Sequence, residues 1–243
     1  MTWSAVLLVT AVVWAVSVIR SVRLRALVYS LPLPMTLALV STPYGVDGAQ
    51  VLGVLGLNLF FGIVAVTYQR LRWPILLADG AGIAAYVALS AGLVAVHIPF
   101  EAALAGTVAL WLAAMLLRRR RARPPTVAAA DEAAAGGRAA GLPALLKLVV
   151  ILVGAILTAL LGAVLRGMVV TFPYSGVLVA VEARHQLSEF SGHFARNSLA
   201  LVGFLTAYHY VQDVSSAGAL GAGWLAFAVV ATALHLPPRP RGS

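Results

Sequence analysis

The chain has no cysteine, which excludes disulfides, thiol nucleophiles and cysteine-ligated metals. Charged residues are scarce as well, at 10% of the 243 residues, whereas soluble domains carry about 25%. The sequence also contains no phosphate-binding loop, nucleophile elbow, zinc-protease pair or dinucleotide fingerprint. These absences argue against ATP-driven work by this chain alone, and we expect no cofactor.

Long apolar runs are abundant instead, and hydrophobic residues make up 61% of the chain. A bilayer core is about 30 Å thick and is crossed by a helix of roughly 20 apolar residues. Runs of this kind recur from one end of the chain to the other. We therefore predict an all-α fold, a polytopic integral membrane protein with about nine transmembrane helices. The expected helices cover residues 3–19, 26–42, 51–67, 75–98, 101–117, 145–165, 167–183, 197–211 and 217–236.

The arginines predict how these helices are oriented. A net charge of +9 would suit nucleic acid, but the arginines lie in short loops beside apolar runs, where they orient helices in the membrane. With the N-terminus outside, every arginine except Arg166 falls on the inside. This asymmetry predicts a multi-pass protein of the cell (inner) membrane, with the N-terminus outside and the C-terminus cytoplasmic. The lipid bilayer is then an expected partner, and nucleic acid is not.

Composition also divides the chain into two membrane halves. Residues 1–117 would form about five helices and residues 144–236 about four. Between them, residues 118–143 begin with arginines and continue rich in alanine, glycine and proline, which is typical of a flexible cytoplasmic linker. Residues 237–243 would be a cytoplasmic tail. Because an odd number of helices precedes the second half, the two halves would have inverted topology.

One stretch of each half resembles the other: R-A-L-V-Y-S-L-P-L-P-M starts at Arg25, and R-G-M-V-V-T-F-P-Y-S-G starts at Arg166. This superposition places Pro32 over Pro173. Proline removes a backbone N–H and interrupts a helix, and in lipid the freed groups need partners. Interruptions at matching positions of inverted halves point to a transport site. The alternative is that the prolines only kink packed helices.

The second stretch carries a resemblance to a known family. It continues as G-M-V-V-T-F-P-Y-S-G-V-L-V-A over residues 167–180, and A-R-N-S-L-A-L-V-G-F-L follows at 195–205. This pair resembles the small GlpM-type inner-membrane proteins, which have a Gly-x-x-x-x-Phe-Pro stretch, a polar loop and an arginine leading into a helix. The resemblance implies a fused inverted repeat of an ancestor that pairs antiparallel. It implies no particular activity.

Polar groups near the two breaks are the candidates for substrate binding. The two arginines that start the broken helices would attract an anionic substrate or anchor the helices at the headgroups. Asn58 is a lone amide in an apolar run, and it would face the central cavity or bond to another helix. The predicted substrate-binding set is Pro32, Pro173, Ser175, Asn58, Arg25 and Arg166.

Two carboxylates are candidates for proton or ion coupling. Asp79 lies early in the fourth expected helix, and Glu182 lies at the end of the seventh. A carboxylate inside a membrane is costly, so it is a functional hypothesis by default. The alternative for Asp79 is a place at headgroup level, paired with Arg70 or Arg72.

A polar stripe follows Glu182 at helical spacing, with His185, Glu189 and His193. Imidazole and carboxylate groups are suitable ligands for Zn²⁺ or Fe²⁺. Four groups along one straight helix extend over about 16 Å, so one ion would take only two neighbours. We favour the alternative, an amphipathic helix on the cytoplasmic interface, and predict no metal site.

Three functions remain open. The leading hypothesis is a small inverted-repeat transporter or channel that moves a small or amphipathic substrate, anionic or lipid-linked, past the proline-broken helices. A second is a membrane-embedded enzyme acting on a lipid or prenyl substrate, with Asp79, Glu182 or a histidine as acid or base. A third is a non-catalytic membrane subunit of a larger complex. The sequence also leaves a homo-oligomer open.

Overall fold

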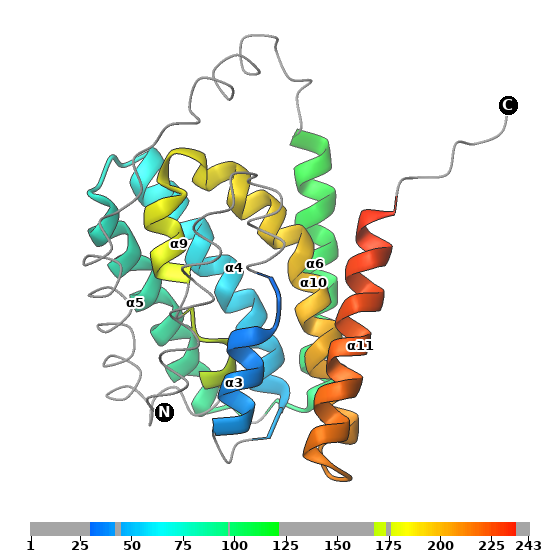
Figure 1. Ribbon diagram of the computed structural model, residues 1–243. Helices are drawn as coiled ribbons and strands as arrows, with labels where there is room; N and C mark the ends of the chain where they lie inside the picture. The colour runs from blue at the N-terminus through cyan, green and yellow to red at the C-terminus, as the bar shows by residue number, and fades with distance from the viewer. Residues whose placement is uncertain (1–29, 42–44, 97, 122–167, 174–175, 237–243) are drawn as a thin grey trace, which may run out of the picture.

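A computed structural model of the chain describes residues 30–41, 45–96, 98–121, 168–173 and 176–236. Over these ranges the fold is all-helical and has no strand, as predicted (Figure 1). The expected helices at 3–19 and 145–165, the linker beyond residue 121 and the tail lie outside the described residues. The described elements are α3 (Leu33–Ser41), α4 (Gly48–Gln69), α5 (Ile75–Val94), α6 (Phe100–Arg121), η1 (Val169–Thr171), α9 (Gly176–Glu182), η2 (Arg184–Gln186), α10 (Leu187–Val211) and α11 (Ser216–His235).

Four of these helices, α4, α5, α6 and α11, are long and apolar enough to cross a membrane. They correspond to four of the runs expected from hydropathy. Local chemistry explains where two of them begin. The Asp47 carboxylate accepts hydrogen bonds from the backbone N–H groups of Ala49 and Gln50 at the start of α4. The Ser215 hydroxyl accepts one from Gly218 at the start of α11.

Helix α10 begins at Leu187, ten residues before the expected start at residue 197. Of the polar stripe that the sequence suggested as an interfacial helix, Glu189 and His193 lie in the first part of α10, whereas Glu182 ends α9 and His185 lies in η2. The helix continues through this stretch because its apolar residues face inward. Leu187, Phe190 and Phe194 are buried, while Glu189 is exposed.

Helix α4 is the centre of the packing. It contacts α5, α6 and α10, and α11 lies on the outer side of α10 (Figure 1). Aromatic rings fill the interface between α4 and α10, where the Phe61 ring centroid lies 5.2 Å from that of Phe190 and 4.8 Å from that of Phe194. Elements from both sequence halves therefore share one hydrophobic core.

Two glycines of α4 allow the chain around η1 to approach closely. A Cβ added to Gly53 would lie 1.8 Å from Thr171 Oγ1. A Cβ added to Gly56 would lie 2.8 Å from the Tyr86 ring and 2.9 Å from the Met168 side chain. Small residues are common at such contacts between membrane helices because they let backbones approach. The glycines thus position the segment that contains the second proline break.

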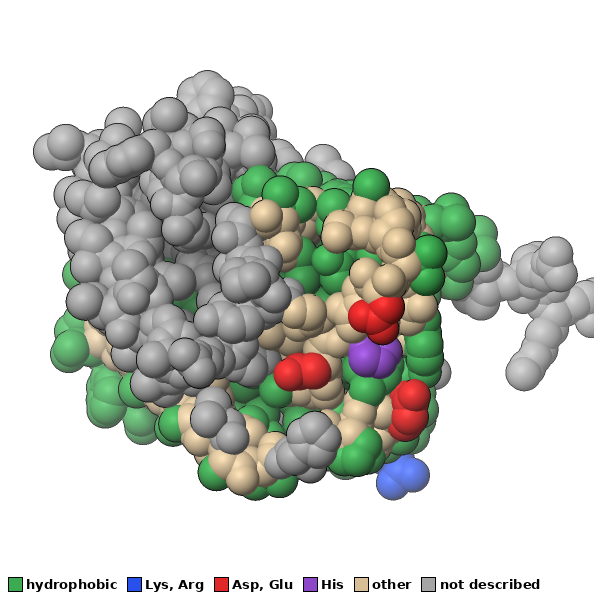
Figure 2. All heavy atoms as spheres, turned by 90° about the horizontal axis from the view of Figure 1, so that it is seen from below, with side chains coloured by type: hydrophobic (Ala, Val, Ile, Leu, Met, Phe, Trp, Pro, Cys, Tyr) green, Lys and Arg blue, Asp and Glu red, His purple; other side chains and the backbone are tan. Residues whose placement is uncertain are grey.

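The two ends of the helix bundle differ in charge. Asp47, Glu101 and Asp213 lie where α4 and α6 begin and α10 ends. This end is tied together by the Gln212 side chain, which bonds to the Val46 backbone, and by a bond from the Tyr210 hydroxyl to Glu101. Figure 2 views this acidic end, where carboxylates and a histidine gather. The arginines Arg70, Arg72, Arg118 and Arg120 lie at the other ends of α4 and α6.

Candidate functional site

The first proline segment interrupts the expected span at 26–42. Residues 30–32 form a turn, and α3 begins only after Pro32. The Pro32 carbonyl accepts hydrogen bonds from Thr36 N at 2.8 Å and Thr36 Oγ1 at 2.7 Å. Pro34 occupies the first helical turn, where an N–H has no intrahelical partner, so its missing donor costs little. With nine residues, α3 is too short to cross a bilayer alone.

The second proline segment has the same construction. The 3₁₀ turn η1 ends at Thr171, Phe172 and Pro173 are irregular, and α9 begins at Gly176. The expected helix at 167–183 is therefore broken at its proline, and α9 has only seven residues. Proline interrupts a helix here for the usual reason, since it offers no N–H and its ring crowds the preceding turn.

These two segments meet inside the molecule. Helix α3 packs against η1, and a cavity of about 40 Å³ lies between them, which is room for a few water molecules. Pro34 lines it from the first segment, and Pro173 and Gly176 line it from the second. Pro32 is buried but does not line the cavity. The wall also includes Leu31, Met35, Leu57, Phe61, Thr171 and Phe194.

Helices α3 and α9 leave this cavity in opposite directions (Figure 1). Helix α3 leads to the acidic end, where α4 begins, and α9 leads to the arginine end, where α10 begins. Opposite directions are what the predicted inverted repeat requires. The relation between complete halves stays a prediction, because residues 1–29 and 145–165 lie outside the described residues.

Tyr86 of α5 is a polar residue that the sequence analysis missed. Its ring is fully buried, and its hydroxyl lies 2.9 Å from the Met168 carbonyl oxygen and 2.8 Å from Thr171 Oγ1. Because Thr171 lines the cavity, Tyr86 connects α5 to the cavity wall. The signal was present in the sequence: Asp79, Gly82 and Tyr86 recur at spacings of three and four and so share one face of the helix.

Asp79 lies on that same face and is 2% exposed. Neither carboxylate oxygen has a hydrogen-bond partner in the described part of the chain, so the pairing with Arg70 or Arg72 does not occur. Asp79 does not line the cavity and lies two helical turns, about 10 Å along α5, from Tyr86. A buried unpaired carboxylate is costly unless it holds a proton or a cation approaches it. This environment suits proton or ion coupling near the arginine end.

Asn58 faces away from the proline-lined cavity. Its Nδ2 donates to the Val54 carbonyl at 2.9 Å and to Ser198 Oγ at 3.1 Å. Ser198 Oγ and Trp111 Nε1 both donate to the Ala195 carbonyl, at 2.9 and 2.7 Å. The interhelical bond that was the alternative for Asn58 is therefore present and links α4, α6 and α10. Asn58 also lines a second cavity on another side of α4.

Several predicted site residues lie wholly or partly outside the described residues. Arg25, Arg166 and Ser175 lie outside the described residues, as do the side chains of Glu182 and His185. The backbone of Glu182 ends α9, and that of His185 lies in η2. Their suggested roles stay predictions.

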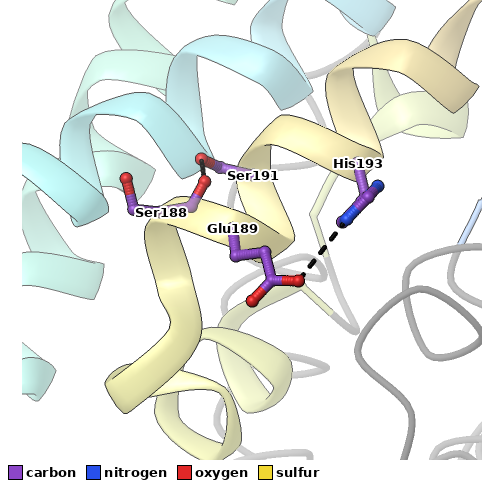
Figure 3. A network of polar contacts seen from close by, with 4 residues as sticks. All are labelled: Ser188, Glu189, Ser191 and His193. Carbon is purple, nitrogen blue, oxygen red and sulfur yellow. Dashed lines mark hydrogen bonds and ion pairs between the residues drawn. The ribbon is translucent and has the colours of Figure 1, made fainter. Parts of the chain in front are cut away.

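The remaining metal-ligand candidates form one pair on α10. Glu189 Oε1 and His193 Nε2 are 3.6 Å apart, one helical turn from each other, and Ser191 donates to the Ser188 carbonyl beside them (Figure 3). Over the described ranges, no three histidine or carboxylate groups lie close enough to hold a metal ion. The pair fits the exposed side of an amphipathic helix.

The comparisons with known proteins add no relative. No protein-family model, curated protein or solved structure matches the chain. The resemblance of residues 167–205 to GlpM-type proteins therefore stays a prediction. The features that bear on function are the two proline segments, their cavity and the buried carboxylate of Asp79.

Proposed function

We propose that the protein is a small membrane transporter or channel whose path passes between the two proline-broken segments. The meeting of α3 and η1 at a cavity, beside helices long enough to cross a bilayer, carries this proposal. Irregular backbone is tolerated at membrane depth where it is buried in protein or lines a cavity. Helices broken at matching positions form the substrate sites of many secondary transporters.

The cavity wall favours a small or amphipathic substrate. Its lining is mostly apolar, and Thr171 supplies a side-chain hydroxyl. A sugar would need many more hydrogen-bonding groups than this wall offers. At about 40 Å³ the cavity holds only a few waters, so we assign the described conformation to the closed state of the path.

Charge supports an orientation for this transporter. Arginine-rich ends of membrane helices face the cytoplasm in most proteins. The end that carries Arg70, Arg72, Arg118 and Arg120 would therefore be cytoplasmic, and the end with Asp47, Glu101 and Asp213 would be outside. With this assignment we propose an outside N-terminus and a cytoplasmic C-terminus, in a bacterial inner membrane as the sequence predicts.

Asp79 supports proton or ion coupling. Its carboxylate is buried without a partner in the described part of the chain, on the α5 face that also carries Tyr86. In the proposed cycle it takes up a proton or cation from the cytoplasmic end. No described residue forms a hydrogen bond with the Asp79 carboxylate.

The test is proton flux in liposomes that contain the purified protein and a pH-sensitive dye. With a membrane potential imposed, wild-type protein should acidify the lumen faster than empty liposomes do, and Asp79→Asn should lose most of this excess. Asp47→Asn is the matched control, because it makes the same charge change at an exposed helix cap that asparagine also fills. A wild-type rate equal to that of empty liposomes would contradict proton uptake through Asp79.

A further inference from the structure

The second cavity lies between α4, α6 and α10 and has a volume of about 120 Å³. It lies on a different face of α4 from the proline-lined cavity. At 100° per residue, Asn58 and Gly62 point about 100° or more away from Leu57, which lines the first cavity. The two cavities are therefore separate sites.

The walls of this second cavity are mostly apolar and reach the surface. Trp111 and Met115 of α6 line one wall, and Gly62 of α4 lines the other. Gly62 has no atom within 4 Å of the place where a Cβ would stand. Leu110, also in the wall, is 59% exposed. An alkyl chain can therefore enter from the side that faces lipid in the proposed orientation.

One end of the cavity carries a positive charge. Arg118 lines it from the arginine end of α6. Its guanidinium reaches α10 at Gly192, where a Cβ would lie 2.9 Å from Arg118 Nη1, so the missing side chain makes room for it. No carboxylate within the described ranges forms an ion pair with Arg118. Arginine binds carboxylate and phosphate groups well because it presents several donors in one plane.

The cavity also contains an unused acceptor and a fixed indole. Asn58 Oδ1 is buried and has no donor within the described ranges, whereas the Asn58 amide nitrogen is already bonded. The bond from Trp111 Nε1 to the Ala195 carbonyl holds the indole against the cavity. The cavity thus has apolar side chains and the Arg118 charge on α6 and the unused acceptor of Asn58 on α4.

We propose that this cavity binds an anionic amphiphile with a single alkyl chain, such as a fatty acid. The oxyanion binds Arg118 at headgroup depth, the chain lies against Trp111, Met115 and Gly62, and Asn58 Oδ1 accepts a hydrogen bond from a trapped water or a ligand hydroxyl. This site does not depend on the path between the proline segments. Failure of either proposal leaves the other intact.

The test uses quenching of tryptophan fluorescence by a brominated fatty acid, with the protein in nanodiscs of zwitterionic lipid. Quenching of Trp111, the tryptophan in the cavity, is obtained by subtracting the quenching that remains in Trp111→Phe. We expect it to saturate with ligand. Gly62→Leu should abolish it by filling the cavity, and Arg118→Gln should weaken binding by about tenfold, as expected for loss of a charge-assisted bond.

Two variants are matched controls. Gly80→Leu makes the same change on α5, where an added Cβ also has no neighbour, and Arg120→Gln removes a charge two residues from Arg118. Both should bind the fatty acid as the wild type does. The proposal is overturned if the quenching does not saturate, if it persists in Gly62→Leu, or if the methyl ester binds equally well. Displacement by inorganic phosphate alone would assign the site to a free anion instead.

Discussion

The two sides of α4 carry two different kinds of polarity. On the side of Leu57 and Phe61, the irregular residues before α3 and α9 surround a cavity of about 40 Å³, to which Thr171 adds a hydroxyl. On the side of Asn58 and Gly62, the neighbouring helices are unbroken, and the polar groups are side chains around a cavity of about 120 Å³. In the two proposals, a membrane fold with few charged residues builds a path from broken helices and a separate binding site from a few side chains.

This difference also explains which residues must be small. Gly53 and Gly56 face η1 and the residues around it, where an added Cβ would overlap other atoms, whereas Gly62 faces open space. The side of Gly53 and Gly56, the close side, is where the irregular segment around η1 packs against α4. The open side is where a ligand can enter.

The largest predicted effect is on the close side. Gly53→Ala places a Cβ within 1.8 Å of Thr171 Oγ1, so η1 must move away from α4. We expect the free energy of unfolding to fall by about 2 kcal/mol, the usual cost of overpacking a tight contact. Thermal unfolding in detergent measures this as a lower Tm. Gly80→Ala should leave Tm unchanged or raise it, and an equal response of the two variants would contradict the close contact.

A smaller effect is predicted for the bond between α5 and the cavity wall. Tyr86→Phe removes the hydroxyl that contacts the Met168 carbonyl and Thr171 Oγ1. The loss of this buried bond should lower the free energy of unfolding by about 1 kcal/mol. Tyr68→Phe is the control, because Tyr68 is only half-buried near the end of α4 and its substitution should change Tm less. If both substitutions change Tm equally, Tyr86 does not hold the segment in place.

Hydropathy predicted the unbroken helices because their apolar runs are long and end at polar residues or prolines. The expected range 51–67 falls within α4, and 217–236 differs from α11 by one residue at each end. The predicted start of α10 was wrong by ten residues. The polar residues Glu189 and His193 suggested that the membrane helix begins later, although Phe190 and Phe194 in the same stretch are buried.

The site was harder to predict than the fold. The prolines are a local signal, because proline acts directly on the backbone, and the structure has irregular residues at 30–32 and 172–173. Which side chains meet depends on long-range packing, so the bond between Tyr86 and Thr171 could not be derived from spacing along one helix. The sequence likewise left open whether Asn58 faces the central cavity or bonds to another helix, because this too depends on packing. The structure shows its hydrogen bond to Ser198 of α10.

The most direct test of the path between the proline segments uses the absence of native cysteine. Met35 and Leu39 lie one turn apart on α3 and are 4% and 6% exposed, but only Met35 lines the cavity. Each is replaced by cysteine in the full chain, in liposomes, and its reaction with a small water-soluble thiosulfonate is timed. If the cavity takes part in a wet path, Met35→Cys should react about tenfold faster, since the reactive thiolate forms readily only where water reaches it. Equal rates for the two variants would contradict the account.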